Sequence, residues 1–200
     1  MTEEPITIRI LALGNSKVGK TSYIIRNVKD IYEMHLSTIG FNIQIKKIEL
    51  KNGKKVNVKF YDTSGQERYH SLAPNFIKTT DGILLMYDIT DRETFDAISK
   101  WYNDILNNKE KDFPIILVGN KTDLEDERQV QREEGEDFAK KLNIKFFEVS
   151  NKDGTNVKES SKELIRMILN HNSDDFKTVC SKLSKKKLKK RKCFLSKVKC

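Results

Sequence analysis

The chain has 200 residues, 37% of them hydrophobic and 34% charged, which is enough for one well-packed domain with a short extension. Its net charge of +9 is confined to residues 171–200, which hold 11 Lys and Arg against 2 Asp, whereas residues 1–170 hold 27 basic and 27 acidic residues. The body therefore has no net charge to attract polyanions. All three cysteines, Cys180, Cys193 and Cys200, follow residue 170, which excludes a disulfide framework and a thiolate metal site in the body.

Membrane-spanning and secretory segments are not indicated either. No apolar run approaches the roughly 18–20 residues that span a bilayer, and Met1-Thr2-Glu3-Glu4 is not typical of a signal peptide. Thr2 also excludes N-myristoylation. A body without cysteine suits the reducing cytoplasm, which is where we expect the protein.

Strand-like and helix-like segments alternate along the chain, which predicts an α/β fold with helices on both faces of a mostly parallel sheet. Strands are expected over residues 6–13, 43–50, 56–60, 82–87, 115–119 and 145–149. Helices are expected from residue 21 onward and over residues 93–106, 133–142 and 156–169. Asn52-Gly53 joins two alternating runs and is typical of a type I′ hairpin, so we expect six strands with one antiparallel edge strand.

The segment between the first strand and the first helix carries the strongest motif. Residues 14–21, Gly-Asn-Ser-Lys-Val-Gly-Lys-Thr, fit the phosphate-binding pattern G-x-x-x-x-G-K-[ST], and the P-loop NTPase fold follows from that placement. Gly14 and Gly19 let successive backbone N–H groups point at one oxyanion at a helix N-terminus. Lys20 would reach the outer phosphates, and the Thr21 hydroxyl would ligate Mg²⁺. The alternative is a glycine-containing loop with a solvated lysine. That interpretation loses support if other motifs in the chain also indicate nucleotide binding.

Three further motifs do agree. Asp62 ends a strand beside the phosphate loop, where it could hold the hydration shell of Mg²⁺, and Gln66 could orient a water toward the terminal phosphate. Asp123, in Asn-Lys-Thr-Asp, could accept hydrogen bonds from N1–H and the exocyclic amine of guanine, a pair of donors that adenine lacks. Residues 150–152, Ser-Asn-Lys, could close over the same base. Trp101 is expected to be a core aromatic.

These motifs, together with Thr38, resemble in order and spacing the small GTPases of the Ras superfamily, and the resemblance covers residues 6–170. Residues 37–42, 67–74 and 87–90 are similar to the Rab branch in particular. The resemblance implies a switch that binds GTP with Mg²⁺, hydrolyses it slowly to GDP and phosphate, and recruits effectors in the GTP state during vesicle and membrane trafficking. It also implies an exchange factor, a GTPase-activating protein and a prenyl-carrier protein as partners. Nucleic acid is not an expected partner.

The resemblance assigns roles to individual residues. The nucleotide-binding set is Asn15, Ser16, Lys17, Val18, Gly19, Lys20, Thr21, Ser22, Thr38, Asp62, Gly65, Asn120, Lys121, Asp123, Ser150, Asn151 and Lys152. The metal set is Thr21, Thr38 and Asp62, and the catalytic set is Gln66, Lys20 and Thr38. Thr38 and the Gly65 amide would order residues 31–42 and 64–78 only when the γ-phosphate is present.

Several positions depart from the family pattern. Ser64 replaces the usual Ala beside the γ-phosphate, and Lys17 stands where Gly or Ala is common. We expect Ser64 to alter hydrolysis or the switch equilibrium. Ser64 and Lys17 leave a GTP-binding scaffold with little or no hydrolysis as an alternative, although Gln66 favours a GTPase. Tyr61, Ile43 and residues 76–79 differ from the usual partner-reading residues. A P-loop kinase for a small molecule is a third possibility, disfavoured by the guanine motif and by the absence of an evident lid or acceptor-site segment.

The sequence divides into a G domain, residues 1–170, and a basic tail, residues 171–200, which we expect to be disordered. The basic run 185–192 would bind an anionic leaflet with a favourable free energy of about 1 kcal/mol per basic residue. A lipid on Cys200 or Cys193 would add the second signal that stable anchoring at the cytosolic face of an intracellular membrane needs. Residues 197–200 do not fit the C-a-a-X pattern, so this expectation comes from the Rab likeness. A nuclear-import or nucleic-acid patch is the alternative.

Overall fold

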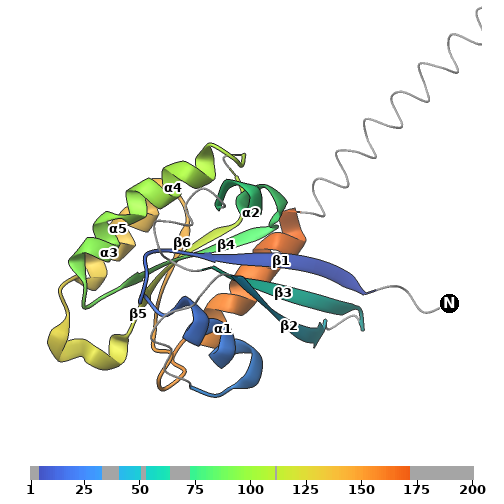
Figure 1. Cartoon of the computed structure of the whole chain (residues 1–200), viewed down its shortest axis with the longest axis horizontal. Helices are drawn as coiled ribbons and strands as arrows, with labels where there is room; N and C mark the ends of the chain where they lie inside the picture. The colour runs from blue at the N-terminus through green and yellow to red at the C-terminus, as the bar shows by residue number, and fades with distance from the viewer. Residues whose placement is uncertain (1–4, 33–40, 51–52, 64–72, 111, 172–200) are drawn as a thin grey trace, which may run out of the picture.

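The computed structural model describes residues 5–32, 41–50, 53–63, 73–110 and 112–171. Its elements are β1 (Ile6–Leu13), α1 (Lys20–Lys29), β2 (Phe41–Glu49), β3 (Lys55–Thr63), α2 (Ala73–Thr79), β4 (Gly82–Asp88), α3 (Arg92–Asp96), α4 (Ile98–Leu106), β5 (Ile115–Asn120), the 3₁₀ helix η2 (Thr122–Glu127), α5 (Arg132–Leu142), β6 (Lys145–Val149) and a final helix over residues 157–171. The strands form one six-stranded sheet in the order β2-β3-β1-β4-β5-β6 (Figure 1). All pairs are parallel except β2–β3, which confirms the predicted fold.

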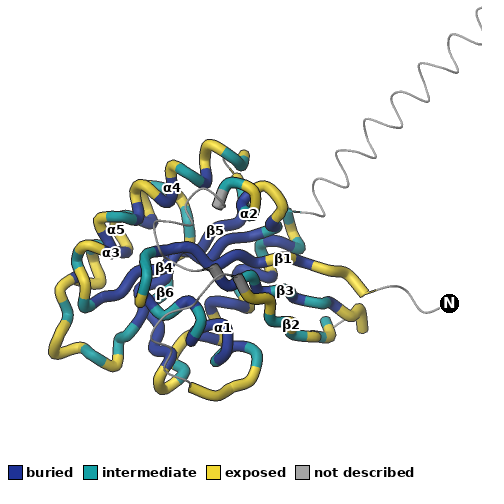
Figure 2. Tube along the Cα trace, viewed as in Figure 1, coloured by how far each residue is buried: buried dark blue, intermediate teal, exposed yellow. Residues whose placement is uncertain are grey.

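Alternating residues of the central strands divide the core into two layers. Ile8 and Ile10 of β1 face α1 and the final helix, whereas Leu11 and Leu13 face α2, α3, α4 and α5. Every residue of β4 and β5 is buried, as expected for strands covered on both faces. Figure 2 shows this buried interior between the exposed outer surfaces of the helices. The parallel strands consequently end along one edge of the sheet, and that edge carries the loops that follow β1, β3, β4, β5 and β6.

The hairpin between β2 and β3 is present, whereas residues 51 and 52, which include Asn52 of the predicted type I′ turn, lie outside the described residues. The Leu50 N–H donates to the Lys54 carbonyl at 2.9 Å, and the Gly53 N–H donates to the Leu50 carbonyl at 2.9 Å. Gly53, which precedes β3, has a φ of 77°. Glycine is therefore used at a left-handed position next to the second strand of the hairpin.

Three helical details were not predicted. The helix expected over residues 93–106 is divided into α3 and α4 at Ala97, and the Asp91 side chain caps the first part by accepting from the Glu93 N–H. The short elements α2 and η2 were missed, because seven and six residues give too little periodicity to recognise.

A methyl group added at Gly135, in the middle of α5, tests how tightly this layer is packed. Its Cβ would lie 2.6 Å from the Tyr87 hydroxyl oxygen and 2.6 Å from Cζ of Phe146. Replacing Gly by Ala ordinarily stabilises a helix by about 1 kcal/mol, but overpacking a core costs about 1–3 kcal/mol. We expect Gly135→Ala to lower the free energy of unfolding by about 1 kcal/mol in urea titrations followed by circular dichroism. Asp137→Ala, on the exposed side of α5, is the control; a Gly135→Ala protein at least as stable as wild type would contradict the packing described here.

Candidate functional site

The phosphate loop lies between β1 and α1 at the carboxyl edge of the sheet, and two of its positions require glycine. Gly14 has a φ of 138° and Gly19 a φ of 94°. A Cβ on Gly14 would lie 2.1 Å from the Met86 carbonyl oxygen of β4, and one on Gly19 would lie 2.3 Å from Nδ2 of Asn120. The loop is therefore pressed directly against its neighbours, with no room for side chains at these points.

Lys20, the first residue of α1, is folded inward under this loop. Its side chain is buried, and its Nζ donates to the Gly14 carbonyl at 2.9 Å and to the Asn15 carbonyl at 2.7 Å. Burial lowers the pKa of the ammonium to about 8, while the nearby Asp62 carboxylate partly opposes the shift. The loop thus holds a cation at the place where a phosphate would supply the opposite charge.

Thr21 and Asp62 meet beside that cation. The Thr21 hydroxyl donates to Oδ2 of Asp62 at 2.8 Å, and Asp62 is 1% exposed. Among the residues that the structure describes, no group of three or more His, Cys, Asp or Glu side chains could hold a metal ion. Mg²⁺ is commonly held by one or two protein oxygens together with phosphate oxygens and water, and a hydroxyl beside a buried carboxylate fits that mode of binding.

Two asparagines join the phosphate loop to the loops after β5 and β6. Nδ2 of Asn120 donates to the Val18 carbonyl at 2.8 Å, and Nδ2 of Asn151 donates to the Gly19 carbonyl at 3.0 Å. Both residues are buried, and within the described part of the chain their Oδ1 atoms have no hydrogen-bond partner. A buried acceptor without a partner is costly, so these two oxygens point to a ligand that carries donors.

Asp123 lies at the start of η2, close to the segment that follows β6. Its Oδ1 accepts from the Ser150 hydroxyl at 2.7 Å, and Nζ of Lys152 lies 3.8 Å from its Oδ2. A carboxylate has about four acceptor positions, so Asp123 can still accept from a base. Lys121 has a φ of 73°, and its ammonium pairs with the buried carboxylate of Asp88, the last residue of β4. The arrangement suits a planar base with two adjacent donors.

The other predicted site residues have different placements. Asn15 and Ser16 are half-buried, Val18 and Ser22 are buried, and Lys17 is exposed with a φ of 65°. The exposure of Lys17 agrees with a solvated side chain outside the cradle. Thr38, Ser64, Gly65, Gln66, Cys180, Cys193 and Cys200 lie outside the described residues.

Trp101 has a contact that the sequence did not predict. It is buried in the apolar layer under α4, as expected, but its Nε1 also donates to Oδ1 of Asn15 at 2.9 Å. A buried indole N–H usually finds a partner, and this general rule was the only available signal.

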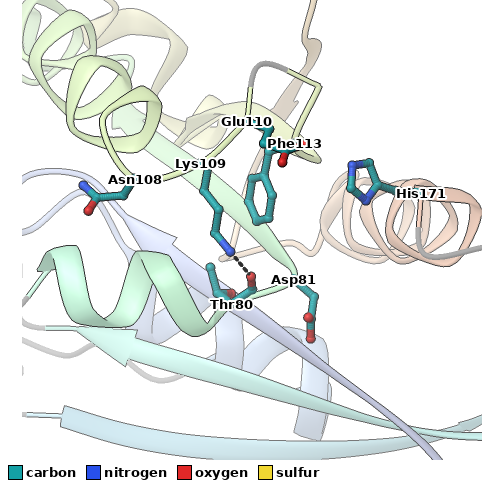
Figure 3. A pocket seen from close by; sticks show the side chains of 7 residues that line it. All are labelled: Thr80, Asp81, Asn108, Lys109, Glu110, Phe113 and His171. Carbon is teal, nitrogen blue, oxygen red and sulfur yellow. Dashed lines mark hydrogen bonds between the residues drawn. The ribbon is translucent and has the colours of Figure 1, made fainter. Parts of the chain in front are cut away.

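A pocket of about 380 Å³ lies at the opposite edge of the sheet, lined by Thr80, Asp81, Asn108, Lys109, Glu110, Phe113 and His171 (Figure 3). The ammonium of Lys109 in this pocket already has partners within the protein. Its Nζ donates to the Thr80 carbonyl at 2.7 Å and lies 4.4 Å from the centre of the Phe113 ring. Oδ2 of Asp81 accepts from the Arg9 N–H at 2.8 Å. These contacts hold together the end of the sheet opposite the phosphate loop, whereas the residues suited to binding a nucleotide lie at the carboxyl edge.

No helix in the described ranges is both long enough and apolar enough to span a bilayer.

Comparison with known proteins agrees with this geometry. A model of the Ras family matches residues 9–170. The chain is 37% identical to Ras-related protein Rab-3C of Bos taurus over 171 residues, which are 85% of this chain and 75% of the relative. It is 39% identical to Ras-related protein Rab-3A of Homo sapiens over 171 residues, 85% of this chain and 77% of the relative. It is 40% identical to Ras-related protein Rab-13 of Rattus norvegicus over 162 residues, 80% of this chain and 79% of the relative.

The glycine at position 14 provides a test of the site. We expect Gly14→Ala to weaken GDP binding by about 100-fold. The new Cβ would lie 2.1 Å from the Met86 carbonyl oxygen, so the loop would have to move by roughly 1 Å to relieve the clash. Gly53→Ala is the matched control, since Gly53 also has a positive φ but has nothing within 4 Å of the position that a methyl group would take. Isothermal titration calorimetry should show near wild-type affinity for the control. Equal affinities of the two variants would show that the close approach at Gly14 does not shape the site.

Proposed function

Because the chain belongs to the Ras family and is a Rab-like small GTPase within it, we propose that residues 14–21 and the surrounding loops form the site where it binds GTP with Mg²⁺. The protein converts GTP to GDP and phosphate, as GTPases of this family do. In the proposal, this reaction switches the protein between a state that recruits effectors to an intracellular membrane and a state that does not.

The observation that carries the assignment of the site is the link between its phosphate side and its base side. Asn120 and Asn151 donate to consecutive carbonyls of the phosphate loop, those of Val18 and Gly19. One rigid unit therefore presents Lys20 to the phosphates and Asp123 to the base. A site that bound only phosphate would have no need for this second set of contacts.

The proposed chemistry is mainly positioning and electrostatic stabilisation. Lys20 would supply a positive charge at the outer phosphates, the Thr21 hydroxyl would ligate Mg²⁺, and Asp62 would hold the hydration shell of the ion. Held there, the ion would supply positive charge that offsets the negative charge of the phosphates. The family likeness adds Thr38 as a metal ligand and Gln66 as the residue that orients the attacking water.

Switching is assigned to residues 31–42 and 64–78, through contacts of Thr38 and the Gly65 amide in the GTP state. Intrinsic hydrolysis is expected to be slow and to be raised by a GTPase-activating protein, while an exchange factor replaces GDP. The effect of Ser64 on the rate stays a prediction. Effectors are assigned to the β2–β3 face beside these segments, where Ile43 is 42% exposed and Ile45 is 51% exposed.

The preference for guanine provides the central test of this function. Replacing Asp123 by Asn removes one of the two acceptors for the guanine donors and places a donor there instead. We expect Asp123→Asn to weaken GTP binding by at least about 100-fold, and to favour xanthosine triphosphate, whose base has a carbonyl in place of the exocyclic amine. Competition against fluorescent GDP measures both affinities. Glu125→Gln, also on η2 but paired with Arg128, is the control. Unchanged selectivity in Asp123→Asn would refute the assignment of the base site.

Membrane attachment provides a second test. We propose that the basic tail and a prenyl group on Cys193 or Cys200 hold the protein at the cytosolic face of a membrane, with a prenyl-carrier protein extracting it. An N-terminally tagged Cys193→Ser/Cys200→Ser protein should move from the membrane fraction to the soluble fraction, whereas Cys180→Ser should not. Mass spectrometry of the native C-terminus identifies the modified residue. An unmodified wild type that is absent from membranes would refute the anchor and favour a nuclear or nucleic-acid role for the tail.

A further inference from the structure

The single tryptophan of the chain connects α4 to the phosphate loop. Trp101 is 5% exposed, and its ring belongs to the apolar cluster that contains Leu13, the last residue of β1, and Ile77 of α2. Its Nε1 leaves this cluster to donate to Oδ1 of Asn15 at 2.9 Å. Residues 86 positions apart are thereby joined at the second position of the phosphate loop.

Asn15 is held from two directions. Its side-chain oxygen accepts from Trp101, and its main-chain carbonyl accepts from Nζ of Lys20 at 2.7 Å. The side chain and the carbonyl of Asn15 share one Cα, so restraining the side chain also restrains the peptide that faces Lys20. The contact with Trp101 is part-buried, where a polar group that loses its partner is costly.

We propose that Trp101 is a positioning residue for the nucleotide site, which through Asn15 holds the phosphate loop in the conformation that presents Lys20 to the phosphates. The inference rests on the proposed function, because it assumes that residues 14–21 bind the nucleotide phosphates. A purely apolar role for residue 101 would be served by Phe. The indole N–H is the part of the side chain that reaches the loop, and it is the part that the proposal concerns.

The test is a double-mutant cycle on the full chain, with dissociation of N-methylanthraniloyl-GDP as the measured rate. Trp101→Phe removes the donor and Asn15→Ala removes the acceptor. We expect each change to speed dissociation about fivefold, the effect of losing one neutral hydrogen bond, and the double variant to dissociate no faster than the faster single variant. The analogue is excited directly, so that loss of the tryptophan does not change its signal. Tyr102→Phe alters the neighbouring aromatic of α4 and should remain within twofold of wild type.

A second measurement does not depend on nucleotide. Because Trp101 is the one tryptophan, the emission spectrum of the protein reports on its surroundings. Asn15→Ala should shift the emission maximum to shorter wavelength, since the excited indole loses its hydrogen-bond acceptor, whereas Tyr102→Phe should leave the maximum unchanged. If Trp101→Phe does not fold, the rate and the emission of Asn15→Ala carry the test.

The outcomes separate this inference from the proposed function. Independent effects, in which the double variant dissociates with the product of the two increases, would overturn the role of Trp101, as would a Trp101→Phe rate within twofold of wild type. An unshifted emission in Asn15→Ala would also overturn it. A wild-type protein that bound no guanine nucleotide would overturn the proposed site and this role together, whereas wild-type binding with independent effects would overturn only the role of Trp101.

Discussion

The buried ammonium of Lys20 is the constraint on which the site depends. Removing a charge from water is costly, and the protein offsets the cost only in part, with two carbonyls of its own loop and with the carboxylate of Asp62. The pKa of Lys20 is accordingly lowered, because burial outweighs the attraction of the Asp62 carboxylate. In the proposed site, an anionic phosphate would complete the compensation, and its binding would offset the remaining cost of burying the ammonium.

The surrounding fold keeps this loop from relaxing around its lysine. Backbone atoms of β4 lie against Gly14, and the amides of Asn120 and Asn151 bind the carbonyls of Val18 and Gly19. Each contact comes from a different strand end, so the position of the loop depends on the register of β1, β4, β5 and β6 together. A change that shifts one strand is therefore expected to disturb phosphate binding without touching the ligand.

The sequence was informative wherever a signal is local. Apolar runs located all six strands, and the motifs identified Lys20, Thr21, Asp62 and Asp123, which the structure places at one edge of the sheet. Features that depend on packing were not foreseen. The break at Ala97 and the short helices α2 and η2 lack periodicity of their own. The hydrogen bond from Trp101 to Asn15 forms only when α4 packs beside the phosphate loop, so no pattern within either segment predicts it.

The edge of the sheet at which His171 lies has a geometric consequence. His171 lies with Thr80 and Asp81 at the start of β4, whereas the phosphate loop follows the end of the parallel strand β1, about 15 Å away along the strands. A lipid on Cys193 or Cys200 would be joined to His171 by a leash no longer than about 75 Å or about 100 Å when fully extended. Under the proposed attachment, a domain tethered from that far edge would be able to turn its nucleotide site away from the bilayer, where regulators could reach it at a range of heights.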